Sequence, residues 1–255
     1  MVNRDSVISL ILPAYNEAEA ISGTLAEVTA YFRGRGRRYD IIVAADGEDG
    51  TRERAREFAR RDAAVRVIGE PVRRGKGKGI REGVRIAIGS IIGFADADNK
   101  VPISEYEKLE PWLYNGFDLV IGSRGLDSSK IERQQRWYRR IGARGFYCFM
   151  HAAVGMPGIE DTQCGFKFFR RDVARELFSR QRIDGYMFDI EVLALAQRLG
   201  YRIKEAPVRW RDDADSRLQL LSGNLRNAID VFRIRSYCRR LSPAPTPIRA
   251  AGSSD

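Results

Sequence analysis

The sequence predicts an α/β protein in which helices cover both faces of a mostly parallel, Rossmann-like β-sheet. Short apolar runs alternate with segments whose apolar residues recur at helical spacing, and the connections between them are short. Polar and charged residues follow the apolar runs, at the positions where open α/β sheets bind their ligands. The 255 residues are enough for one domain with a substantial core.

The first half of the chain contains the regular part of this pattern. We expect Pro13 to end the first strand and Asn16 to cap the helix that follows it. The predicted strands, each a short apolar run bounded by breakers, are residues 7–12, 40–45, 65–68, 90–95 and 118–123. Further helices are predicted at residues 51–61, from the basic, glycine-rich loop 73–79 through Ala87, and near 104–114.

The second half is less regular and more basic. Residues 131–154 and 217–239 are predicted to be basic amphipathic helices, which either lie on a membrane surface or partner or are ordinary surface helices. Residues 242–255 are rich in Pro, Ala and Ser and are predicted to be a disordered tail, so a single domain covers residues 1–241. The remaining expected elements are helices near 171–179 and 188–199 and a strand at 202–208.

The net charge of +10 indicates an anionic partner. Nucleic acid, anionic lipid and phosphorylated small molecules would all suit such a charge, but no zinc-finger spacing or aromatic RNA-binding signature accompanies it. Three irregularly spaced cysteines favour a reducing compartment over a disulfide framework or a zinc cluster. The sequence shows no signal-peptide pattern and no apolar run of the length of a membrane helix, so we expect a soluble or peripheral protein.

The strand at residues 90–95 stops on two carboxylates, Asp96 and Asp98. Because side chains alternate along a strand, both would point to the same side, where they repel each other unless a positive charge lies between them. A hard divalent cation that itself holds substrate phosphates would satisfy both carboxylates. An isolated D-x-D is also typical of a solvated turn after a strand, so the other motifs must decide between the two interpretations.

Two further motifs follow predicted strand ends. Asp46 and Asp49 come after the second strand, where a carboxylate can accept hydrogen bonds from a base or a ribose. Gly75-Lys76-Gly77 places a cation on backbone that can approach a phosphate closely. The spacings match neither a P-loop nor a Rossmann fingerprint. Each motif is weak alone, but their order at successive strand ends is a strong joint signal.

With these motifs, the sequence resembles the family 2 glycosyltransferases of GT-A fold over roughly residues 6–217. The resemblance implies a nucleotide-sugar half, residues 1–124, and an acceptor half, residues 125–241. The motifs that carry it are Pro13 to Glu17, Asp46 to Thr51, Gly75-Lys76-Gly77 and Asp96-Ala97-Asp98. The motifs similar to the branch that glycosylates polyprenyl phosphates (the dolichyl-phosphate glucosyltransferases and dolichol-phosphate mannose synthases) are Gly122-Ser123-Arg124, Asp161 to Lys167 and Phe188 to Glu191.

The resemblance implies a donor site at the strand ends. Asp96 and Asp98 would hold Mg²⁺ or Mn²⁺ against the diphosphate, with Asp98 nearest the metal. Lys76 would lie near the base or the diphosphate, and either Asp46 or Asp49 would meet the base. The other donor-binding residues that it implies are Pro13, Tyr15 and Glu17 around the nucleotide, and Gln163 and Asp189 beside the sugar.

The resemblance also implies an acceptor site rich in arginine. A phosphate acceptor is already ionised near neutrality and needs positioning, for which the bidentate geometry of arginine is suited. A hydroxyl acceptor needs a general base instead, and Asp161 is the candidate. The residues implied to meet an acceptor phosphate are Arg124 and Arg139, helped by Arg211, Ser216 or Arg217.

Together these observations favour an inverting, metal-dependent hexosyltransferase that uses UDP-glucose or GDP-mannose and a polyprenyl or dolichyl phosphate. We expect it to be cytoplasmic and peripheral to the inner face of the cell membrane, as a monomer or an oligomer, and not to bind nucleic acid. Transfer to a hydroxyl of a soluble or protein-bound acceptor stays open, because the sequence lacks a membrane helix that eukaryotic relatives carry and has Ala143 where the mannose synthases have a serine. The second alternative is a basic nucleic-acid-binding module.

The double substitution Asp96→Ala with Asp98→Ala separates these classes. We expect it to abolish metal-dependent glycosyl transfer while the circular dichroism spectrum stays native, because the cation that neutralises the leaving diphosphate would lose its ligands. A nucleic-acid-binding module would instead keep salt-sensitive affinity for DNA or RNA in the double variant. Full transferase activity in the double variant would contradict the enzyme interpretation.

Overall fold

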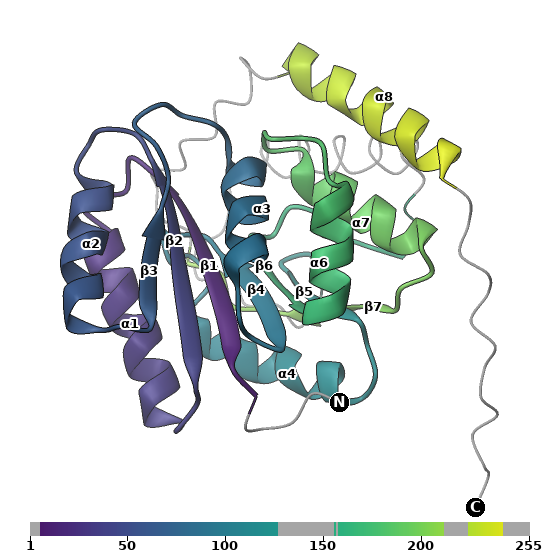
Figure 1. Cartoon of the computed structure of the whole chain (residues 1–255). Coiled ribbons are helices and arrows are strands. Elements are labelled where there is room, and N and C mark those ends of the chain that lie inside the picture. The colour runs from purple at the N-terminus through teal and green to yellow at the C-terminus, as the bar shows by residue number, and fades with distance from the viewer. Residues whose placement is uncertain (1–5, 127–155, 157, 212–223, 242–255) are drawn as a thin grey trace, which may run out of the picture.

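The protein is built around a seven-stranded β-sheet with the strand order β3-β2-β1-β4-β6-β5-β7 (Figure 1). The computed structural model describes residues 6–126, 156, 158–211 and 224–241. The strands are β1 (Ile8–Tyr15), β2 (Tyr39–Asp46), β3 (Val65–Ile68), β4 (Ile91–Ala95), β5 (Leu119–Ser123), β6 (Phe166–Arg170) and β7 (Ile203–Pro207). The helices are α1 (Ile21–Gly34), α2 (Thr51–Arg61), α3 (Lys76–Ile86), the 3-10 helix η1 (Ile103–Glu105), α4 (Tyr106–Tyr114), α6 (Arg171–Arg180), α7 (Phe188–Arg198) and α8 (Asn224–Arg240). The expected mostly parallel sheet between helices is therefore confirmed.

The direction of β6 decides which loops meet. Strands β1 to β4 are mutually parallel, and β5 pairs with β7 in parallel. Among the described strands, β6 alone runs antiparallel to its neighbours, β4 and β5, so that Phe166 at its start pairs with Ala95 at the end of β4. The segment before β6 therefore lies at the same edge as the carboxyl ends of the other strands. This edge, uppermost in Figure 1, is called the carboxyl edge below.

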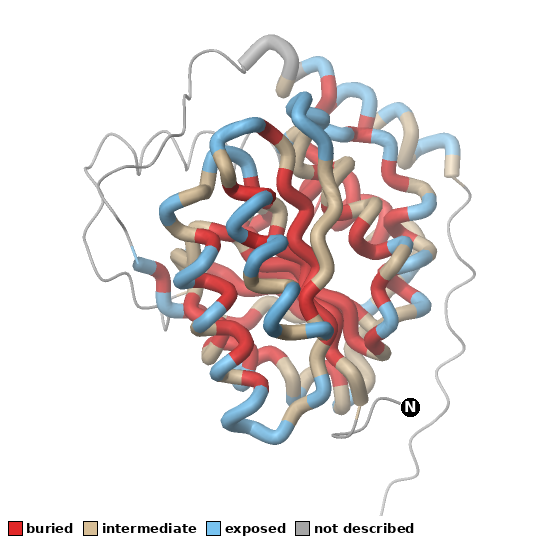
Figure 2. The backbone as a smooth tube through the Cα atoms, turned by 60° about the vertical axis from the view of Figure 1, so that its left-hand side comes forward, coloured by how far each residue is buried: buried red, intermediate tan, exposed pale blue. Residues whose placement is uncertain are grey.

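Two hydrophobic layers hold the helices against the sheet. Alternate residues of β1 contribute to opposite layers, because side chains of a strand point alternately to its two faces: Leu10 belongs to one and Ile11 to the other. Helices α1, α2 and α4 supply the first layer, and α3, α6, α7 and α8 supply the second. Figure 2 shows the buried strands in the middle of the molecule and the exposed outer sides of the helices.

Three predictions for the first half were wrong in detail. β1 continues through Pro13 to Tyr15, because beyond Ile11 its registered partner is β2 alone, and a missing N–H costs little where one side of a strand is unpaired. Asn16 adopts a left-handed φ of 58° instead of capping α1, whose N-cap is Ala20. α3 begins at Lys76, so the second half of the predicted glycine-rich loop is helical.

The later predictions are confirmed where the structure describes the chain. The predicted helices near 171–179 and 188–199 are α6 and α7, and the predicted strand at 202–208 is β7. The described part of the last amphipathic segment forms α8. The predicted helix at 131–154 and the predicted tail at 242–255 lie outside the described residues. No helix in the described ranges combines the length and apolar character that crossing a bilayer requires.

Gly93→Ala tests how tightly β6 packs on β4. A Cβ atom at Gly93 would lie 2.2 Å from a ring carbon of Phe168, a buried side chain that has no room to move. We expect the free energy of unfolding, measured with urea, to fall by about 1–3 kcal/mol. The control is Gly23→Ala in α1, where nothing lies within 4 Å of the added atom; there the stability should hold or rise by up to about 1 kcal/mol. Equal losses in both variants would contradict the close packing.

Candidate active site

The carboxyl edge gathers most of the described residues that the sequence singled out. Asp96 and Asp98 follow β4, and Arg124 follows β5. Asp161 and its neighbours reach the same edge because β6 runs antiparallel, so they lie beside the end of β4. The backbone N–H of Asp96 donates to the carbonyl of Gly165 at 3.1 Å, and a Cβ atom on Gly165 would lie 2.1 Å from a carboxylate oxygen of Asp96. Any larger residue at Gly165 would therefore force the Asp96 carboxylate to move.

Lys76 forms an ion pair with Asp96 at the centre of this edge. Its ammonium lies 2.5 Å from Oδ1 of Asp96. Burial by itself would lower the pKa of Lys76, but the charges of Asp96 and Asp189 and the hydrogen bond to Asp96 raise the pKa overall. Lys76 therefore stays charged and pairs with the first carboxylate of the D-x-D motif.

The sequence suggested that the two glycines around Lys76 let the backbone approach a phosphate closely. In the structure, both glycines have a packing role. A Cβ atom would lie 2.3 Å from the carbonyl oxygen of Asp184 at Gly75 and 2.4 Å from that of Ile183 at Gly77. The N–H groups of Gly77 and Lys78 both donate to the Asp184 carbonyl. The start of α3 is thus hydrogen-bonded to the loop before α7, and this contact fixes the position of Lys76.

Asp98 fits the expected role of a metal ligand. Its carboxylate is partly exposed and lies 3.4 Å from Nζ of Lys100. Burial, followed by the charge of Asp96, raises the pKa of Asp98, and a cation bound beside both carboxylates would offset these effects. Two carboxylates at a strand end offer the hard oxygen ligands that Mg²⁺ and Mn²⁺ bind, with diphosphate oxygens able to complete the coordination. Within the described residues no group of three or more His, Cys, Asp or Glu side chains is placed to hold a metal ion.

Behind this pair lies a fully buried ion pair between Lys167 and Asp189. Lys167 of β6 has no exposed surface; its ammonium lies 2.7 Å from Oδ1 of Asp189 on α7 and 2.6 Å from the carbonyl oxygen of Cys164. Burial raises the pKa of Asp189, although the charges of Lys167 and Lys76 act to lower it. Carboxylates and ammonium groups therefore alternate from Asp96 through Lys76 and Asp189 to Lys167.

Arg124 and Asp161 form a bidentate ion pair. Nε and Nη2 of Arg124 donate to the two oxygens of Asp161 at 2.7 and 2.9 Å, and the backbone N–H of Arg124 donates as well. Burial by itself would raise the pKa of Asp161, but the charge and hydrogen bonds of Arg124 lower it overall. A carboxylate held in this way is a weak proton acceptor, which argues against the base role considered for Asp161.

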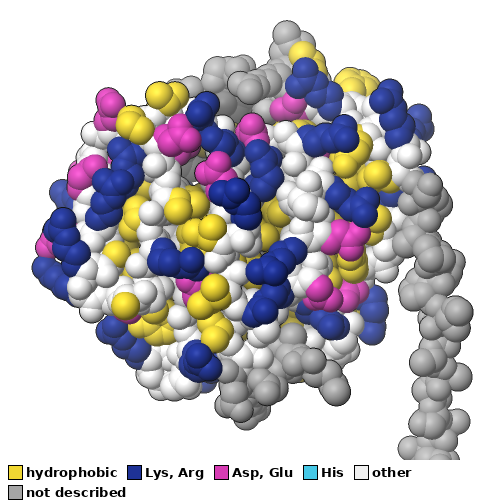
Figure 3. Space-filling model, in the orientation of Figure 1, with side chains coloured by type: hydrophobic (Ala, Val, Ile, Leu, Met, Phe, Trp, Pro, Cys, Tyr) yellow, Lys and Arg dark blue, Asp and Glu magenta, His cyan; other side chains and the backbone are white. Residues whose placement is uncertain are grey.

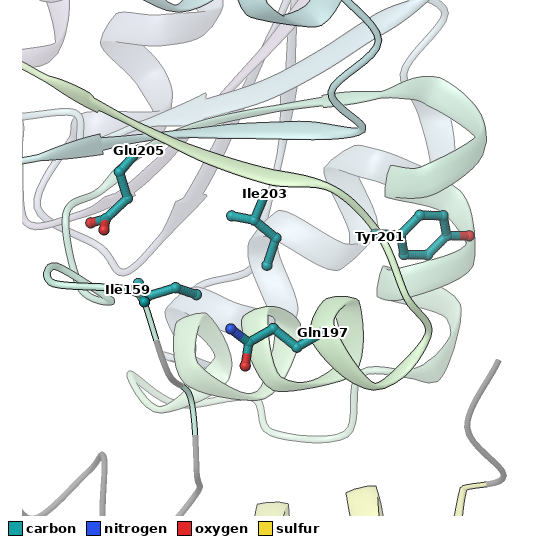
Figure 4. Close-up of a pocket in the computed structure, with 6 residues that line it drawn as sticks. Ile159, Gln197, Tyr201, Ile203 and Glu205 are labelled. Carbon is teal, nitrogen blue, oxygen red and sulfur yellow. The ribbon is translucent and has the colours of Figure 1, made fainter. Parts of the chain in front are cut away.

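Glu205 of β7 holds the segment that carries Asp161. Its two carboxylate oxygens accept the backbone N–H groups of Glu160 and Asp161 at 2.8 and 3.0 Å. Figure 4 shows Glu205 reaching from β7 toward the chain at Ile159. The residues around it that line a cavity of about 190 Å³ are Gly158, Ile159, Gln197, Tyr201, Ile203 and Glu205.

The two carboxylates at the end of β2, Asp46 and Asp49, hold neighbouring loops in place. Asp46 accepts the N–H groups of Glu70 and Arg74, at 3.2 and 2.8 Å. Asp49 accepts the hydroxyl and N–H of Thr51 and the N–H of Ala18, and although burial acts to raise its pKa, these hydrogen bonds lower it. Both residues lie at the carboxyl edge, and their contact with a base stays a prediction.

The remaining sequence candidates divide into those that this edge includes and those that the structure does not describe. Tyr15 is exposed at the end of β1, and the guanidinium of Arg73 lies 4.3 Å from its ring centroid. The N–H of Arg211 donates to the carbonyl of Lys100, so the loop after β7 reaches the D-x-D turn. Also at this edge are Pro13 within β1, Glu17, whose N–H donates to Thr51, and Gln163, whose N–H donates to Asp161. Arg139, Ser216 and Arg217 lie outside the described residues.

Sequence reasoning missed three charged residues of this site. Lys100 follows the D-x-D motif by two positions, which is a local signal that could have been used. Lys167 interrupts an apolar strand, and a lysine in such a run indicates a buried partner. Glu205 gave no local signal, because its partners lie more than forty residues away in the sequence.

Lys167→Met tests the buried ion pair. Removing the ammonium leaves the Asp189 carboxylate buried without its partner, so we expect the free energy of unfolding to fall by about 3–5 kcal/mol in urea denaturation. Adding Asp189→Leu should recover part of this loss, because replacing a whole buried pair costs less than breaking it. Lys78→Met is the control, since Lys78 makes only surface pairs at 3.4 Å; its loss should stay below about 1 kcal/mol. A double variant less stable than Lys167→Met would refute the pairing.

Comparison with known proteins agrees with this geometry. The sequence model of glycosyl transferase family 2 matches residues 9–178. A dolichyl-phosphate beta-glucosyltransferase of Trichomonas vaginalis is 34% identical over 242 residues, which are 91% of this chain and 71% of that protein. The dolichyl-phosphate beta-glucosyltransferase of Homo sapiens is 32% identical over 243 residues, covering 89% of this chain and 74% of that protein.

Solved structures share the fold at lower identity. Mannosyl-3-phosphoglycerate synthase from Rubrobacter xylanophilus aligns with a TM-score of 0.69 at 18% identity, covering 98% of this chain and 79% of that one. Glucosyl-3-phosphoglycerate synthase from Mycobacterium tuberculosis, in complex with Mn²⁺, UDP-glucose and phosphoglyceric acid, aligns with a TM-score of 0.67 at 23% identity, covering 94% and 81%. These likenesses concern the fold alone. From the family match and the relatives together, the chain belongs to glycosyl transferase family 2 and is a hexosyltransferase of GT-A fold.

Proposed function

We propose that this enzyme transfers glucose, with inversion, from UDP-glucose to a polyprenyl phosphate and depends on Mg²⁺ or Mn²⁺. The observation that carries the acceptor assignment is the bidentate pair of Arg124 with Asp161. In this pair, Arg124 occupies the Asp161 carboxylate, which a hydroxyl acceptor would need as a general base. The pair also holds Arg124 in place for a phosphate acceptor, which needs no base. The names of relatives that align with about nine-tenths of the chain support glucose and a lipid phosphate.

On the donor side, charge decides the roles. Asp96 and Asp98 are the residues that would hold the divalent cation, which when bound neutralises the charge that develops on the leaving diphosphate. The Lys76 ammonium would move from Asp96 to a diphosphate oxygen over a short distance, because both lie at the same edge. Asp189, kept in place by Lys167, would remain as a fixed carboxylate beside the sugar.

On the acceptor side, positioning replaces proton transfer. Nε and Nη2 of Arg124 bind Asp161, and Nη1, which takes no part in this pair, would meet an oxygen of the acceptor phosphate. The guanidinium carbon of Arg124 also lies 5.5 Å from the ring centroid of Trp210, within the range of a cation–π contact. An ionised phosphate held in this way attacks the anomeric carbon from the face opposite the leaving group, which gives the inverted, β-linked product.

The enzyme would meet its acceptor at a membrane. A polyprenyl phosphate is anchored in a bilayer by its chain, and the net charge of +10 would favour the anionic surface of the inner leaflet. We therefore place the protein in the cytoplasm, peripheral to the inner face of the cell membrane, with membrane contact as part of its function.

A donor and acceptor panel tests this assignment. UDP-glucose and GDP-mannose are each supplied with Mn²⁺, with and without a polyprenyl phosphate, and the product is identified by mass spectrometry and by its anomeric proton coupling. We expect transfer from UDP-glucose alone, dependence on the lipid phosphate, and a β linkage. Loss of transfer on chelation, restored by Mn²⁺ or Mg²⁺, is the expected metal response.

Three outcomes would replace parts of the proposal. Transfer from GDP-mannose would overturn the donor assignment and leave the acceptor assignment in place. Transfer to a soluble or protein-bound hydroxyl with indifference to the lipid would establish the alternative acceptor class. Absence of donor turnover combined with salt-sensitive nucleic-acid binding would favour the binding-module alternative.

A further inference from the structure

The exposed large hydrophobic side chains are distributed unevenly over the molecule. In the described part of the chain, five of six lie toward the carboxyl edge and one, Ile88, lies at the opposite edge. Ile88 precedes β4, and its N–H donates to Asp40 near the start of β2. The five are Tyr15 at the end of β1, Val72 in the loop after β3, Tyr186 in the loop before α7, and Ile229 and Phe232 on α8. A soluble monomer rarely gathers exposed apolar groups on one side without a binding role.

The two loops that carry Val72 and Tyr186 are held in place. Val72 is 66% and Tyr186 58% exposed. Arg73 joins the loops: Nη2 donates to the Tyr186 hydroxyl at 3.1 Å, and the guanidinium also stacks on Tyr15. The hydrogen bonds from the start of α3 to the Asp184 carbonyl bind the same loops together. The apolar tips therefore project from an ordered rim.

α8 extends this rim. Its inner residues Val231 and Ile234 are buried in the core, whereas Phe232 on its outer side is 61% exposed. Contacts with the end of α6 and the next loop fix its place: the Tyr237 hydroxyl donates to the Arg180 carbonyl at 3.2 Å, and Arg182 stacks on the Tyr237 ring. In Figure 1, α8 lies above α7, on the side of the carboxyl edge.

Positive charge accompanies the apolar groups. Arg73 and Arg74 follow Val72 directly, and both are exposed. From Ile229 to Arg240, α8 carries four arginines (Arg233, Arg235, Arg239 and Arg240) and one acidic residue, Asp230. Figure 3 shows hydrophobic atoms together with Lys and Arg atoms along the upper rim of the molecule, with Asp and Glu atoms between them. Apolar tips between guanidinium groups are the combination that enters the headgroup region of an anionic bilayer.

We propose that this rim, made of Val72, Tyr186, Ile229 and Phe232 with Arg73, Arg74 and Arg233, is the surface by which the protein docks on an anionic lipid bilayer. The assignment rests on the proposed function, which requires the acceptor phosphate to come from a membrane. It places the bilayer against the edge that carries Arg124 and Asp96, so that a lipid phosphate reaches the site without leaving its leaflet. The tips belong to separate projecting loops and a helix, and a flat, fluid surface can receive all of them at once.

Vesicle binding without any acceptor lipid tests the surface directly. The purified full chain is sedimented with sucrose-loaded vesicles of phosphatidylcholine containing about a third phosphatidylglycerol, and with pure phosphatidylcholine vesicles. We expect salt-sensitive binding to the anionic vesicles, and a loss of at least ~10-fold in partitioning for Val72→Glu with Phe232→Glu, because two anchors lose their apolar burial and gain repulsion. The matched control is Ile88→Glu, which changes a 59% exposed residue at the opposite edge and should bind as the wild type does.

Failure of this surface is distinguishable from failure of the proposed function. UDP binding by calorimetry and transfer to a short-chain, water-soluble polyprenyl phosphate should be unchanged in the double variant, whereas transfer to a long-chain lipid in vesicles should fall in step with binding. Wild-type vesicle binding with no glucosyl transfer to lipid phosphate would leave the docking surface standing and overturn the function. Absence of wild-type binding, an equal loss for Ile88→Glu, or dissociation of a dimer by Phe232→Glu without any vesicle binding would overturn the docking surface.

Discussion

The buried pair of Lys167 and Asp189 is the interaction on which the site depends. It joins β6, which connects the two parts of the sheet, to the first turn of α7, and it also holds the carbonyl of Cys164 in the segment beside Asp96. A buried ammonium needs such partners, because an unpaired charge in the interior costs several kcal/mol. Because the Lys167 ammonium needs a carboxylate partner, this pair determines where Asp189 lies. Asp189 in turn is part of the charged environment of Lys76.

The same logic extends outward to the surface of the site. Lys76 and Lys100 each pair with one carboxylate of the D-x-D motif, so each carboxylate of the motif already has an ammonium partner. A cation and a donor diphosphate of opposite charge would enter together more readily than either alone. On the acceptor side, Glu205 and Asp161 hold Arg124 in a similar chain of charge and hydrogen bonds, which gives one guanidinium a fixed orientation.

Local pattern predicted every described strand except β6, and the loops after them, because buried strands are short apolar runs and their ends carry polar residues. It placed Asp96, Asp98 and Asp46 at one edge for this reason. Neither β6 nor its direction was predicted, since Lys167 and Arg170 interrupt the apolar character of Phe166–Arg170 and nothing in these five residues indicates which way the strand runs. Nor were the contacts of Gly75 and Gly77 with Ile183 and Asp184, where the glycines are required by a neighbour that is remote in the sequence.

The position of β6 between β4 and β5 also has a consequence for folding during synthesis. β4 and β5 are synthesised before β6 but do not pair with each other. Both pair with β6, which can happen only after residues 124–165 have been made. Until then, the nascent sheet of β1 to β4 presents the unpaired backbone of β4 as an edge strand, the kind of surface at which chains aggregate. The two parts of the sheet can therefore join only once Phe166–Arg170 has left the ribosome, and slow synthesis of residues 124–165 would lengthen the time for which β4 stays exposed as an edge strand.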